Sequence, residues 1–144
     1  MRQTICGTDL TSYAGTFIAV LPSELRSVLK TVPKRTDNTG NSSTAFANVT
    51  VTTDVIFLLA EYEVFGTIAM ANTNESVKQT QYAYYRAGNS KVKYKHTATS
   101  TTATWWLRSP YSDNATAFVY VGSLGNVGSY NAYRSIGFAP AFCV

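Results

Sequence analysis

Tyrosine, serine, asparagine and glycine dominate the segment from Tyr111 to Ile136, and together they suit recognition chemistry. The segment holds four Tyr, four Ser, three Asn and three Gly, with single Asp, Thr and Arg residues. Tyr gives a large contact area at low entropic cost, and Ser, Gly and Asn give adaptable hydrogen bonds, as in antibody binding loops. The composition therefore predicts a ligand-binding surface in the last third of the chain.

Five residue types are absent from the C-terminal segment Tyr111–Val144, which contains no Lys, Glu, Gln, Met or Trp. At the frequency of these residues in the preceding part of the chain, roughly five would be expected there. Their complete absence has a chance on the order of one in a few hundred.

All codons for these five residue types end in a purine. Randomising the first two bases of codons that end in a pyrimidine would exclude every one of them, and Asn codons changed at their adenines would give the residues observed. The alternative is a tight-turned β region that disfavours long side chains. Composition alone leaves both interpretations open.

Residues that could catalyse a reaction or bind a metal are few. One His and two Cys make no metal-ligand pattern. Cys6 lacks the basic neighbours that lower a thiol pKa, and Cys143 lies in an apolar terminal segment. His96 has no evident nucleophile as a partner. We therefore expect no catalytic residue, no metal and no cofactor. Because no export signal is visible we favour free thiols, although pairing of the terminal strands would make Cys6 and Cys143 neighbours that could form a disulfide.

The length of the chain predicts one domain, residues 1–144, with a hydrophobic core that needs no disulfide or metal to stabilise it. No apolar run is long enough to span a membrane, and the residues after Met1 contain no signal peptide. We therefore expect a chain that is cytosolic at synthesis or an excised piece of a longer protein. The net charge of +4 comes largely from two basic clusters, and the aromatics around them are too few for nucleic-acid binding. The second cluster, Lys91–Lys95, alternates as a protected edge strand does, or it meets an anionic partner.

The first half of the chain must supply a scaffold for this surface. The apolar run Thr16–Val20 predicts a short buried strand, and Leu21–Lys30 predicts a helix, with Pro22 in its first turn and Pro33 beyond its end. Thr36–Asn48 is polar and predicts a loop. Val49–Thr52 alternates like a strand. Asp54–Ala60 is a strand or a core helix; we favour a strand, followed by a helical turn Glu61–Phe65 that Gly66 ends.

The second half predicts β structure that carries the surface. Tyr82–Arg86 and Lys91–Lys95 read as extended, and Thr97–Thr104 as a loop. Trp105–Arg108 can bury a large apolar area, with Arg108 anchoring the segment after it and Ser109-Pro110 turning the chain. Phe118–Val121 and Val127–Tyr133 alternate around the turn Ser123–Asn126 and predict a hairpin. Val119, Val121, Val127 and Ala132 then point inward, and Phe138–Val144 closes the chain as a strand.

The run Trp105–Pro110 and the ending Gly137–Val144 resemble a family of C-terminal domains in bacterial and phage proteins, many from the gut, that is catalogued as of unknown function. Leu21–Arg26, Asp54–Gly66 and Tyr82–Tyr85 resemble the same family, so the similarity covers most of the chain. Members include target proteins of diversity-generating retroelements, in which a reverse transcriptase mutates adenines while copying a template into the 3′ end of the target gene. The resemblance implies an α+β, C-type lectin-like fold with mixed or antiparallel sheets, one or two short helices and a C-terminal display hairpin.

Within a variable region of about residues 105–144, the resemblance implies which positions are diversified and bind ligand. These are Tyr111, Asp113, Asn114, Thr116, Tyr120, Gly122, Gly128, Ser129, Tyr130, Asn131, Tyr133, Arg134 and Ile136. It also implies a fixed frame of Ser112, Ala115, Val119, Val121, Ser123, Gly125, Val127, Ala132, Ser135 and Gly137. The calcium-lectin tripeptides Glu-Pro-Asn and Trp-Asn-Asp are absent, so calcium-dependent sugar binding is not implied.

The function implied is recognition without catalysis, by a variable receptor-binding domain on a phage tail or tip or on a bacterial cell surface. Its partner would be a host-surface protein or glycan of variable identity, with no nucleic acid and no membrane insertion, and the chain would act as a homo-oligomer, as part of a longer chain or alone. Two alternatives stay open: an invariant structural or adhesive virion module, and a cysteine-dependent oxidase-like enzyme of the C-type lectin superfamily.

Overall fold

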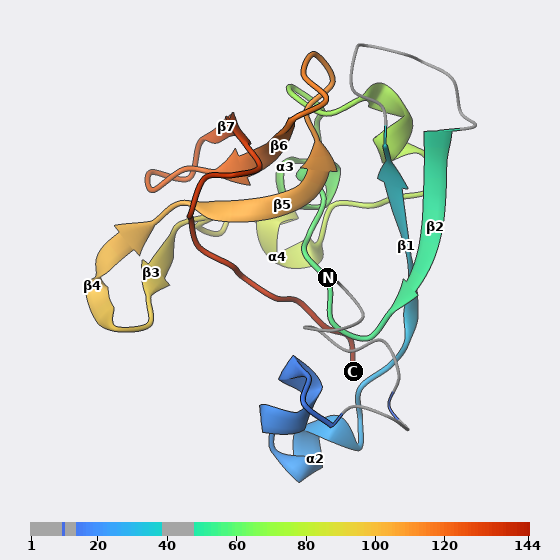
Figure 1. Ribbon diagram of the computed structural model, residues 1–144, viewed down its shortest axis with the longest axis vertical. Coiled ribbons are helices and arrows are strands. Elements are labelled where there is room, and N and C mark those ends of the chain that lie inside the picture. The colour runs from blue at the N-terminus through green and yellow to red at the C-terminus, as the bar shows by residue number, and fades with distance from the viewer. Residues whose placement is uncertain (1–9, 11–13, 39–47) are drawn as a thin grey trace. The chain divides into compact units, whose positions relative to one another are not determined.

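A computed structural model describes residues 10, 14–38 and 48–144 of the chain and shows short helices together with small sheets (Figure 1). The predicted α+β class is confirmed. Cys6 and most of the predicted loop Thr36–Asn48 lie outside the described residues. The helical elements are η1 (Phe17–Val20), α2 (Ser23–Arg26), α3 (Glu61–Phe65), η3 (Thr73–Ser76) and α4 (Ala83–Arg86). None of the described helices is long and apolar enough to cross a membrane.

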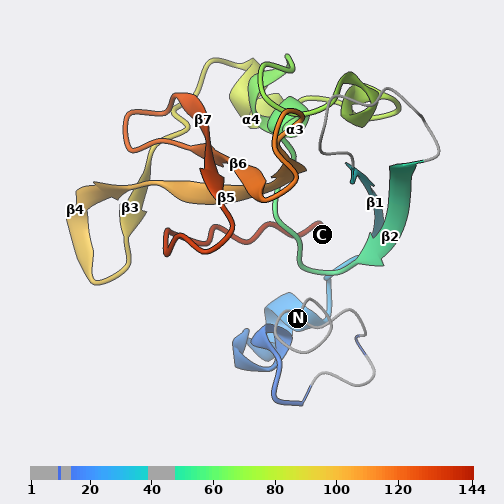
Figure 2. The same cartoon turned by 45° about the horizontal axis from the view of Figure 1, so that its top comes forward.

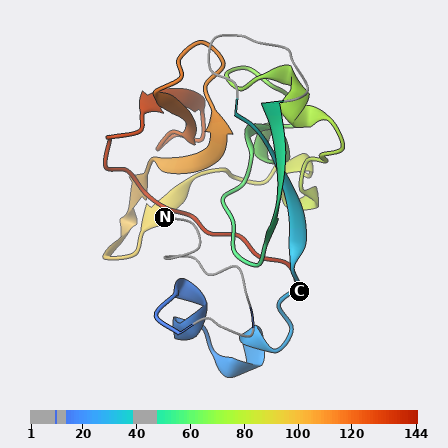
Figure 3. The ribbon, with the colours of Figure 1, turned by 45° about the vertical axis from the view of Figure 1, so that its right-hand side comes forward.

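Seven strands in the described residues form three small sheets. β1 pairs with β2 as a two-stranded ribbon (Figure 3), β3 pairs antiparallel with β4, and β5, β6 and β7 form a three-stranded antiparallel sheet in that order. The strands are β1 (Val32–Asp37), β2 (Val49–Asp54), β3 (Lys93–Lys95), β4 (Ala98–Ala103), β5 (Trp105–Pro110), β6 (Ala117–Val121) and β7 (Val127–Asn131).

The chain forms two compact units. The first comprises residues up to Lys34 together with Val51–Phe57 and Pro140–Val144, and the second comprises Arg35–Thr50 and Leu58–Ala139. All residues predicted to bind ligand belong to the second unit. The expectation of a single ligand-binding domain over residues 1–144 stays a prediction.

The first unit has a small apolar core and departs from the sequence-based prediction in its helices. Ile18, Leu29, Val55 and Ile56 are buried together. The predicted strand Thr16–Val20 is wrong: these residues form η1, and the Arg26 guanidinium donates to the carbonyl oxygens of Ala19 and Leu21 at 3.0 and 2.5 Å. Those oxygens are therefore bound by a side chain, where a strand would offer them to a neighbouring strand.

The helix predicted over Leu21–Lys30 is much shorter in the structure, where α2 covers only Ser23–Arg26. The N–H of Lys30 binds the carbonyl of Cys143 at 2.9 Å, and Val28, within the predicted helix, is half exposed. The prediction extends the helix too far, because tertiary pairing competes with the helix for the residues after Arg26.

The terminal strand predicted over Phe138–Val144 is also wrong. This segment makes isolated bridges only, from Ala141 to Phe57 and from Cys143 to Lys30. Pro140, directly before Ala141, has no N–H to donate to a ladder that would extend from Ala141 towards Phe138. Cys143 carries a free, partly buried thiol.

The second unit is built around the sheet of β5, β6 and β7, with α3 and α4 beside each other near β5 (Figure 2). Trp105, Leu107, Val119 and Val121 are fully buried in it. The predicted helical turn Glu61–Phe65 is confirmed as α3, and Gly66 ends it in the left-handed conformation (φ 71°) that favours glycine. The preference for a strand over Asp54–Ala60 is correct only at its start, because β2 ends at Asp54 and the buried residues that follow make a single bridge.

Two predictions between residues 82 and 104 are wrong: the first missed a helix and the second missed a strand. Tyr82–Arg86 was predicted as extended but contains α4, closed by the N–H of Arg86 on the carbonyl of Tyr82 at 3.0 Å. Thr97–Thr104 was predicted as a loop but contains β4, because β-branched threonines fit a pleated strand well. Lys93–Lys95 forms the predicted edge strand β3, and the β3–β4 hairpin extends outward from β5 (Figure 1).

Candidate ligand-binding surface

The hairpin of β6 and β7 separates its side chains onto two faces, as predicted. Ala117, Val119 and Val121 are buried, whereas Phe118 is exposed and Tyr120 is partly exposed. In the register of the sheet Phe118 pairs with Tyr130, and Tyr120 pairs with Gly128. Because directly paired residues share a face, one face carries three aromatic side chains. We call Phe118, Tyr120, Gly128 and Tyr130 the outer face.

The aromatic rings of the outer face are packed on one another. The rings of Tyr120 and Tyr130 are stacked, with centroids 4.4 Å apart and planes 21° apart. Gly128 makes this possible, because a Cβ at that position would lie 2.5 Å from the Tyr120 ring. Burial against this strand, together with the neighbouring Tyr130 hydroxyl, raises the pKa of Tyr120. The stack is therefore a rigid aromatic platform.

The turn after β7 places a cation beside this platform. The N–H of Arg134 binds the carbonyl of Asn131 at 3.0 Å, and the Asn131 amide donates to the Tyr133 hydroxyl at 3.4 Å. The guanidinium carbon of Arg134 lies 5.9 Å from the centre of the Tyr130 ring and 5.7 Å from that of Tyr133. These distances are within the range of cation–π attraction. Tyr120, Tyr130, Arg134 and Tyr133 thus form a continuous series of contacts.

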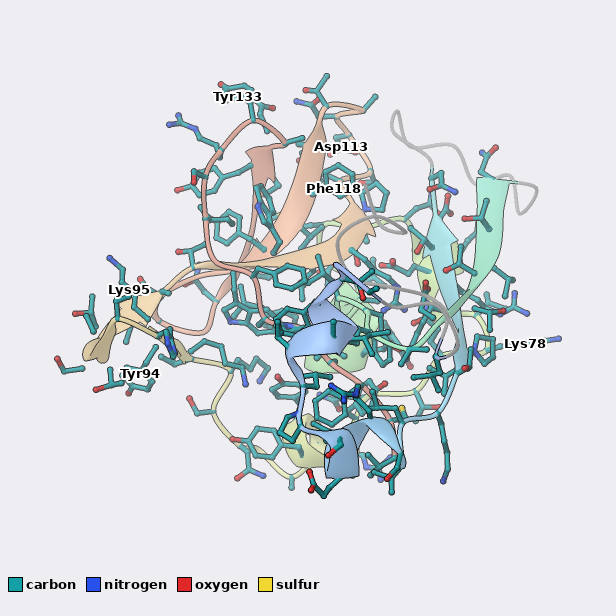
Figure 4. The ribbon with its side chains drawn as sticks, turned by 60° about the horizontal axis from the view of Figure 1, so that its bottom comes forward. Lys78, Tyr94, Lys95, Asp113, Phe118 and Tyr133 are labelled. Atoms are coloured by element: carbon teal, nitrogen blue, oxygen red, sulfur yellow. The ribbon has the colours of Figure 1, made fainter. Side chains whose placement is uncertain are left out.

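The loop between β5 and β6 is joined to the same end of the hairpin. Asn114 Oδ1 accepts hydrogen bonds from the N–H and hydroxyl of Thr116 at 2.9 and 2.8 Å, and the Thr116 hydroxyl reaches Asn131 Oδ1 at 3.3 Å. In the same loop Tyr111 donates to Asp113 at 3.2 Å, and the Asp113 charge raises the pKa of Tyr111. Asp113 and Tyr133 both lie on loops at the edge of this unit (Figure 4).

The structure thus brings eight of the thirteen predicted site residues together, pairs Tyr111 with Asp113 in the loop before β6 and leaves three apart. Gly122 is buried in the tight turn at the other end of the hairpin, where its N–H binds the Asn126 carbonyl at 2.7 Å. Ser129 pairs with Val119 and so shares the inner face. Ile136 is partly buried beyond the turn. We call the residues that do meet the display cluster: Asn114, Thr116, Tyr120, Gly128, Tyr130, Asn131, Tyr133 and Arg134.

One residue of this surface was missed. Phe118 was not predicted as part of the site, yet 36% of it is exposed and it faces Tyr130 across the strands. The period-two alternation that placed Tyr120 outward would also have placed Phe118 there.

Some of the predicted fixed residues have a structural role. Gly125 adopts a positive φ of 84°, and a Cβ on Gly137 would lie 2.7 Å from the Thr104 carbonyl oxygen. Val119 and Val121 are fully buried. Ala115 and Ser135 are exposed, and so is Ala132, which was expected to point inward, because β7 already ends at Asn131.

Arg108 anchors β5, the strand that leads into the loop 111–116, as predicted. We call residues 111–116 the display loop. From β5 the Arg108 guanidinium donates to the carbonyls of Arg35 and Leu58 at 3.1 and 2.8 Å, to Gln79 Oε1 at 2.6 Å and to the Glu63 carboxylate at 2.5 Å. The side chains of Arg108 and Glu63 are only 11% and 7% exposed. This ion pair therefore ties β5 to α3 in surroundings with little water.

Glu61 supports the display loop in a second way. Its buried carboxylate accepts hydrogen bonds from the backbone N–H groups of Ala69, Met70 and Ala71 at 2.6–3.2 Å. The carbonyl of Met70 in turn accepts the N–H of Ser112 at 2.9 Å, and the Glu61 N–H donates to Ser109 Oγ at 2.8 Å. Both ends of the transition from β5 into the loop are thus held by one glutamate and the segment it organises.

A third glutamate is buried in the same unit. Glu75 is fully buried, and neither carboxylate oxygen has a hydrogen-bond partner among the described residues. Loss of hydration raises its pKa to about 8; the nearby Ser109 and Arg108 moderate this rise, and the charges of Glu61 and Glu63 add to it. Glu75 is therefore protonated at neutral pH. We call Glu61, Glu63, Glu75 and Arg108 the buried footing.

Sequence reasoning did not identify the three glutamates of the footing. A signal was present, because the chain has only four Glu, and two of them, at 61 and 63, adjoin the apolar run 55–60. Among the described residues no group of three or more His, Cys, Asp or Glu side chains has an arrangement that could hold a metal ion.

Comparison with known families places the chain in one of them. Residues 8–144 match the family described as "Domain of unknown function (DUF6273)", and the chain belongs to it. No curated protein and no solved structure gives a significant match.

Proposed function

We propose that the chain is a variable ligand-binding domain with a C-type lectin-like fold, diversified by a retroelement and displayed on a phage particle or a bacterial surface protein. It acts by recognition alone and has no catalytic role. Its partner is a host-surface protein or glycan whose identity changes with the display cluster. The observation that carries the proposal is the continuous contact among Tyr120, Tyr130, Tyr133 and Arg134, all predicted to vary, over the buried Val119 and Val121.

The C-terminal segment contains no Lys, Glu, Gln, Met or Trp. The exposure of its side chains supports codon randomisation as the explanation, rather than a fold that disfavours long side chains. Asp113, Asn114, Tyr133 and Arg134 are all exposed, and Tyr133 keeps 78% of its surface. Exposed positions of this kind accept long polar side chains such as Lys, Glu or Gln. A preference of the fold for short side chains therefore does not account for their absence.

The composition of the display cluster supports recognition of a macromolecule. Tyr and Arg are enriched among the residues that dominate interface energetics. The cluster stands on a hairpin whose inner face is a packed core, so little order has to be gained on binding.

Deep sequencing of the 3′ end of the gene across one natural population tests the proposal. We expect substitutions confined to the first two bases of the codons predicted to vary, with the codons for Val119, Val121 and residues 58–71 constant as the internal control. A nearby near-copy with Asn codons at the variable positions would identify the template. Uniform codons throughout, or changes spread equally over the core codons, would contradict the proposal and favour an invariant virion module.

A further inference from the structure

Arg134 is the cation of the display cluster, and no counter-ion faces it among the residues that the structure describes. Its side chain makes no hydrogen bond or ion pair with any other residue that the structure describes; its contacts are with the rings of Tyr130 and Tyr133. From Tyr111 to Val144 the sequence holds one acid, Asp113, and the hydroxyls of Tyr111 and Ser112 already donate to that carboxylate at 3.2 and 3.1 Å.

The neighbours of Arg134 also restrict its geometry. Two aromatic rings within 6 Å lower the freedom of the guanidinium, and the turn from Asn131 to Arg134 is closed by a backbone hydrogen bond. Stacked aromatic rings attract the faces of a guanidinium and leave its in-plane N–H groups available. Those N–H groups match two oxygens of a carboxylate in a bidentate pair.

We propose that Arg134, flanked by Tyr130 and Tyr133, binds an Asp or Glu carboxylate of a protein partner. The proposal rests on the proposed function and names the chemistry of the ligand for this version of the display cluster. A single cation matches a singly charged carboxylate, whereas a phosphate carries about two charges at neutral pH, and no Lys is present between Tyr111 and Val144 to balance the second. The apolar platform of Tyr120 and Phe118 beside the cation suits the rest of a polypeptide.

The test is selection of a random library of 12-residue peptides against the purified wild-type chain, with the variants Arg134→Gln and Arg134→Lys in parallel. We expect the enriched peptides to share an Asp or Glu at one position. Arg134→Gln should weaken their binding at least tenfold, and replacement of that peptide acid by its amide should cause the same loss. Arg134→Gln combined with the amide-substituted peptide should reduce the binding affinity no more than either change alone. Arg134→Lys should show an intermediate loss, because it keeps the charge but not the planar fork.

The outcomes separate this inference from the proposed function. Enriched peptides without a shared acid, or acidic peptides that bind Arg134→Gln as tightly as wild type, would overturn the carboxylate site and leave a ligand-binding surface in place. Binding to sialylated or uronate glycans on an array, with no peptide enriched, would show that the carboxylate comes from a glycan and not from a protein partner. Binding to neither the peptide library nor the glycan array would count against the proposed function and the inference together.

Discussion

The display cluster and the buried footing lie in the same unit, and Arg108, Glu61 and Glu63 of the footing have more hydrogen-bond partners than the charged and exposed side chains of the cluster. In the footing, the guanidinium of Arg108 donates to four separate acceptors and Glu61 accepts from three backbone N–H groups. In the display cluster, Arg134 touches two rings and Tyr133 is largely exposed. Buried polar groups with many partners are costly to change, and exposed ones are not.

This difference suggests how one chain can combine a variable surface with a constant fold. The transition from β5 into the display loop is held by hydrogen bonds at Ser109 and Ser112. The exposed side chains of the display cluster are therefore not needed to hold this transition. If the comparison is right, changes in the footing should alter stability strongly, whereas changes in the cluster should alter binding and change stability by no more than about 1.5 kcal/mol.

The largest effect is expected from Arg108→Met. The substitution leaves the buried Glu63 carboxylate without its cation and removes four hydrogen bonds, and breaking a buried pair in this way costs about 3–5 kcal/mol. Urea unfolding followed by circular dichroism measures the loss. Arg134→Met is the matched control, with an expected change within about 0.5 kcal/mol. Equal stability of the two variants would show that the footing does not differ from the cluster.

The pH dependence of stability should reveal Glu75. Its pKa is about 8 when folded, against an ordinary value of 4.5, so between those values the folded chain holds a proton that the unfolded chain releases. Stability from this group is therefore complete below about pH 4.5 and is lost as pH rises towards about 8, at up to about 1.4 kcal/mol per pH unit. Urea unfolding between pH 5 and 8 measures this slope.

Glu75→Gln separates this contribution from all others, because glutamine stays neutral over the whole range. The variant should lack the decline between pH 5 and 8 and should be more stable than wild type at pH 8. Glu24→Gln is the control, since Glu24 is fully exposed and its pKa is lowered. Parallel curves for wild type and Glu75→Gln would refute the buried, protonated carboxyl.

The two regions also differ in how well the sequence predicts them. The display hairpin follows from strict alternation in Phe118–Val121 and from the turn at Gly125, and the surface character follows from the Tyr, Ser and Asn content. The footing depends on partners far apart in the chain, as with Glu63 and Arg108, which are separated by 45 positions. Local patterns contain no information about which distant carbonyls will meet a buried charge.

Elements outside the hairpin show the same limit. α3 could be predicted because Gly66 ends it locally. The strand assigned to Thr16–Val20 and the long helix assigned to Leu21–Lys30 fail because Arg26 and Cys143 provide partners that the local pattern does not specify. The threonines of β4 were read as a loop from polarity alone, although their β-branching pointed to a strand.

A smaller effect is expected within the display cluster, at Gly128 on β7. Gly128→Ala lowers the conformational entropy of the unfolded chain, which stabilises the folded state by about 0.4–1 kcal/mol. The Cβ of the new alanine, however, displaces the Tyr120 ring from Tyr130. Loss of that stack costs about 0.5–1.5 kcal/mol. The single substitution should therefore be nearly neutral, whereas in a Tyr120→Ala background it should stabilise.

A double-mutant cycle over Tyr120 and Gly128 measures this coupling, with a value of about 0.5–1.5 kcal/mol expected. Val51→Ala is a suitable control, since Val51 is half exposed on β2 and belongs to the other compact unit, so it should not couple to either position. Additive effects within the error of the measurement would show that the ring is not held over Gly128. Coupling would mean that two positions predicted to vary constrain one another, so that an aromatic residue at 120 favours glycine at 128.

The smallest effect on stability is expected from the combined substitution Tyr133→Ser and Arg134→Ser, which leaves the stack of Tyr120 and Tyr130 in place. Both side chains are exposed and their ring contacts lie at the surface, so the free energy of unfolding should change by no more than about 0.5 kcal/mol in total. Binding to peptides selected by the wild-type chain should be lost completely, because an aromatic anchor and the cation are removed together. Thermal unfolding and surface plasmon resonance on the same samples measure both quantities. A large loss of stability would place the display cluster in the frame, and retained binding would place the recognition surface elsewhere on the chain.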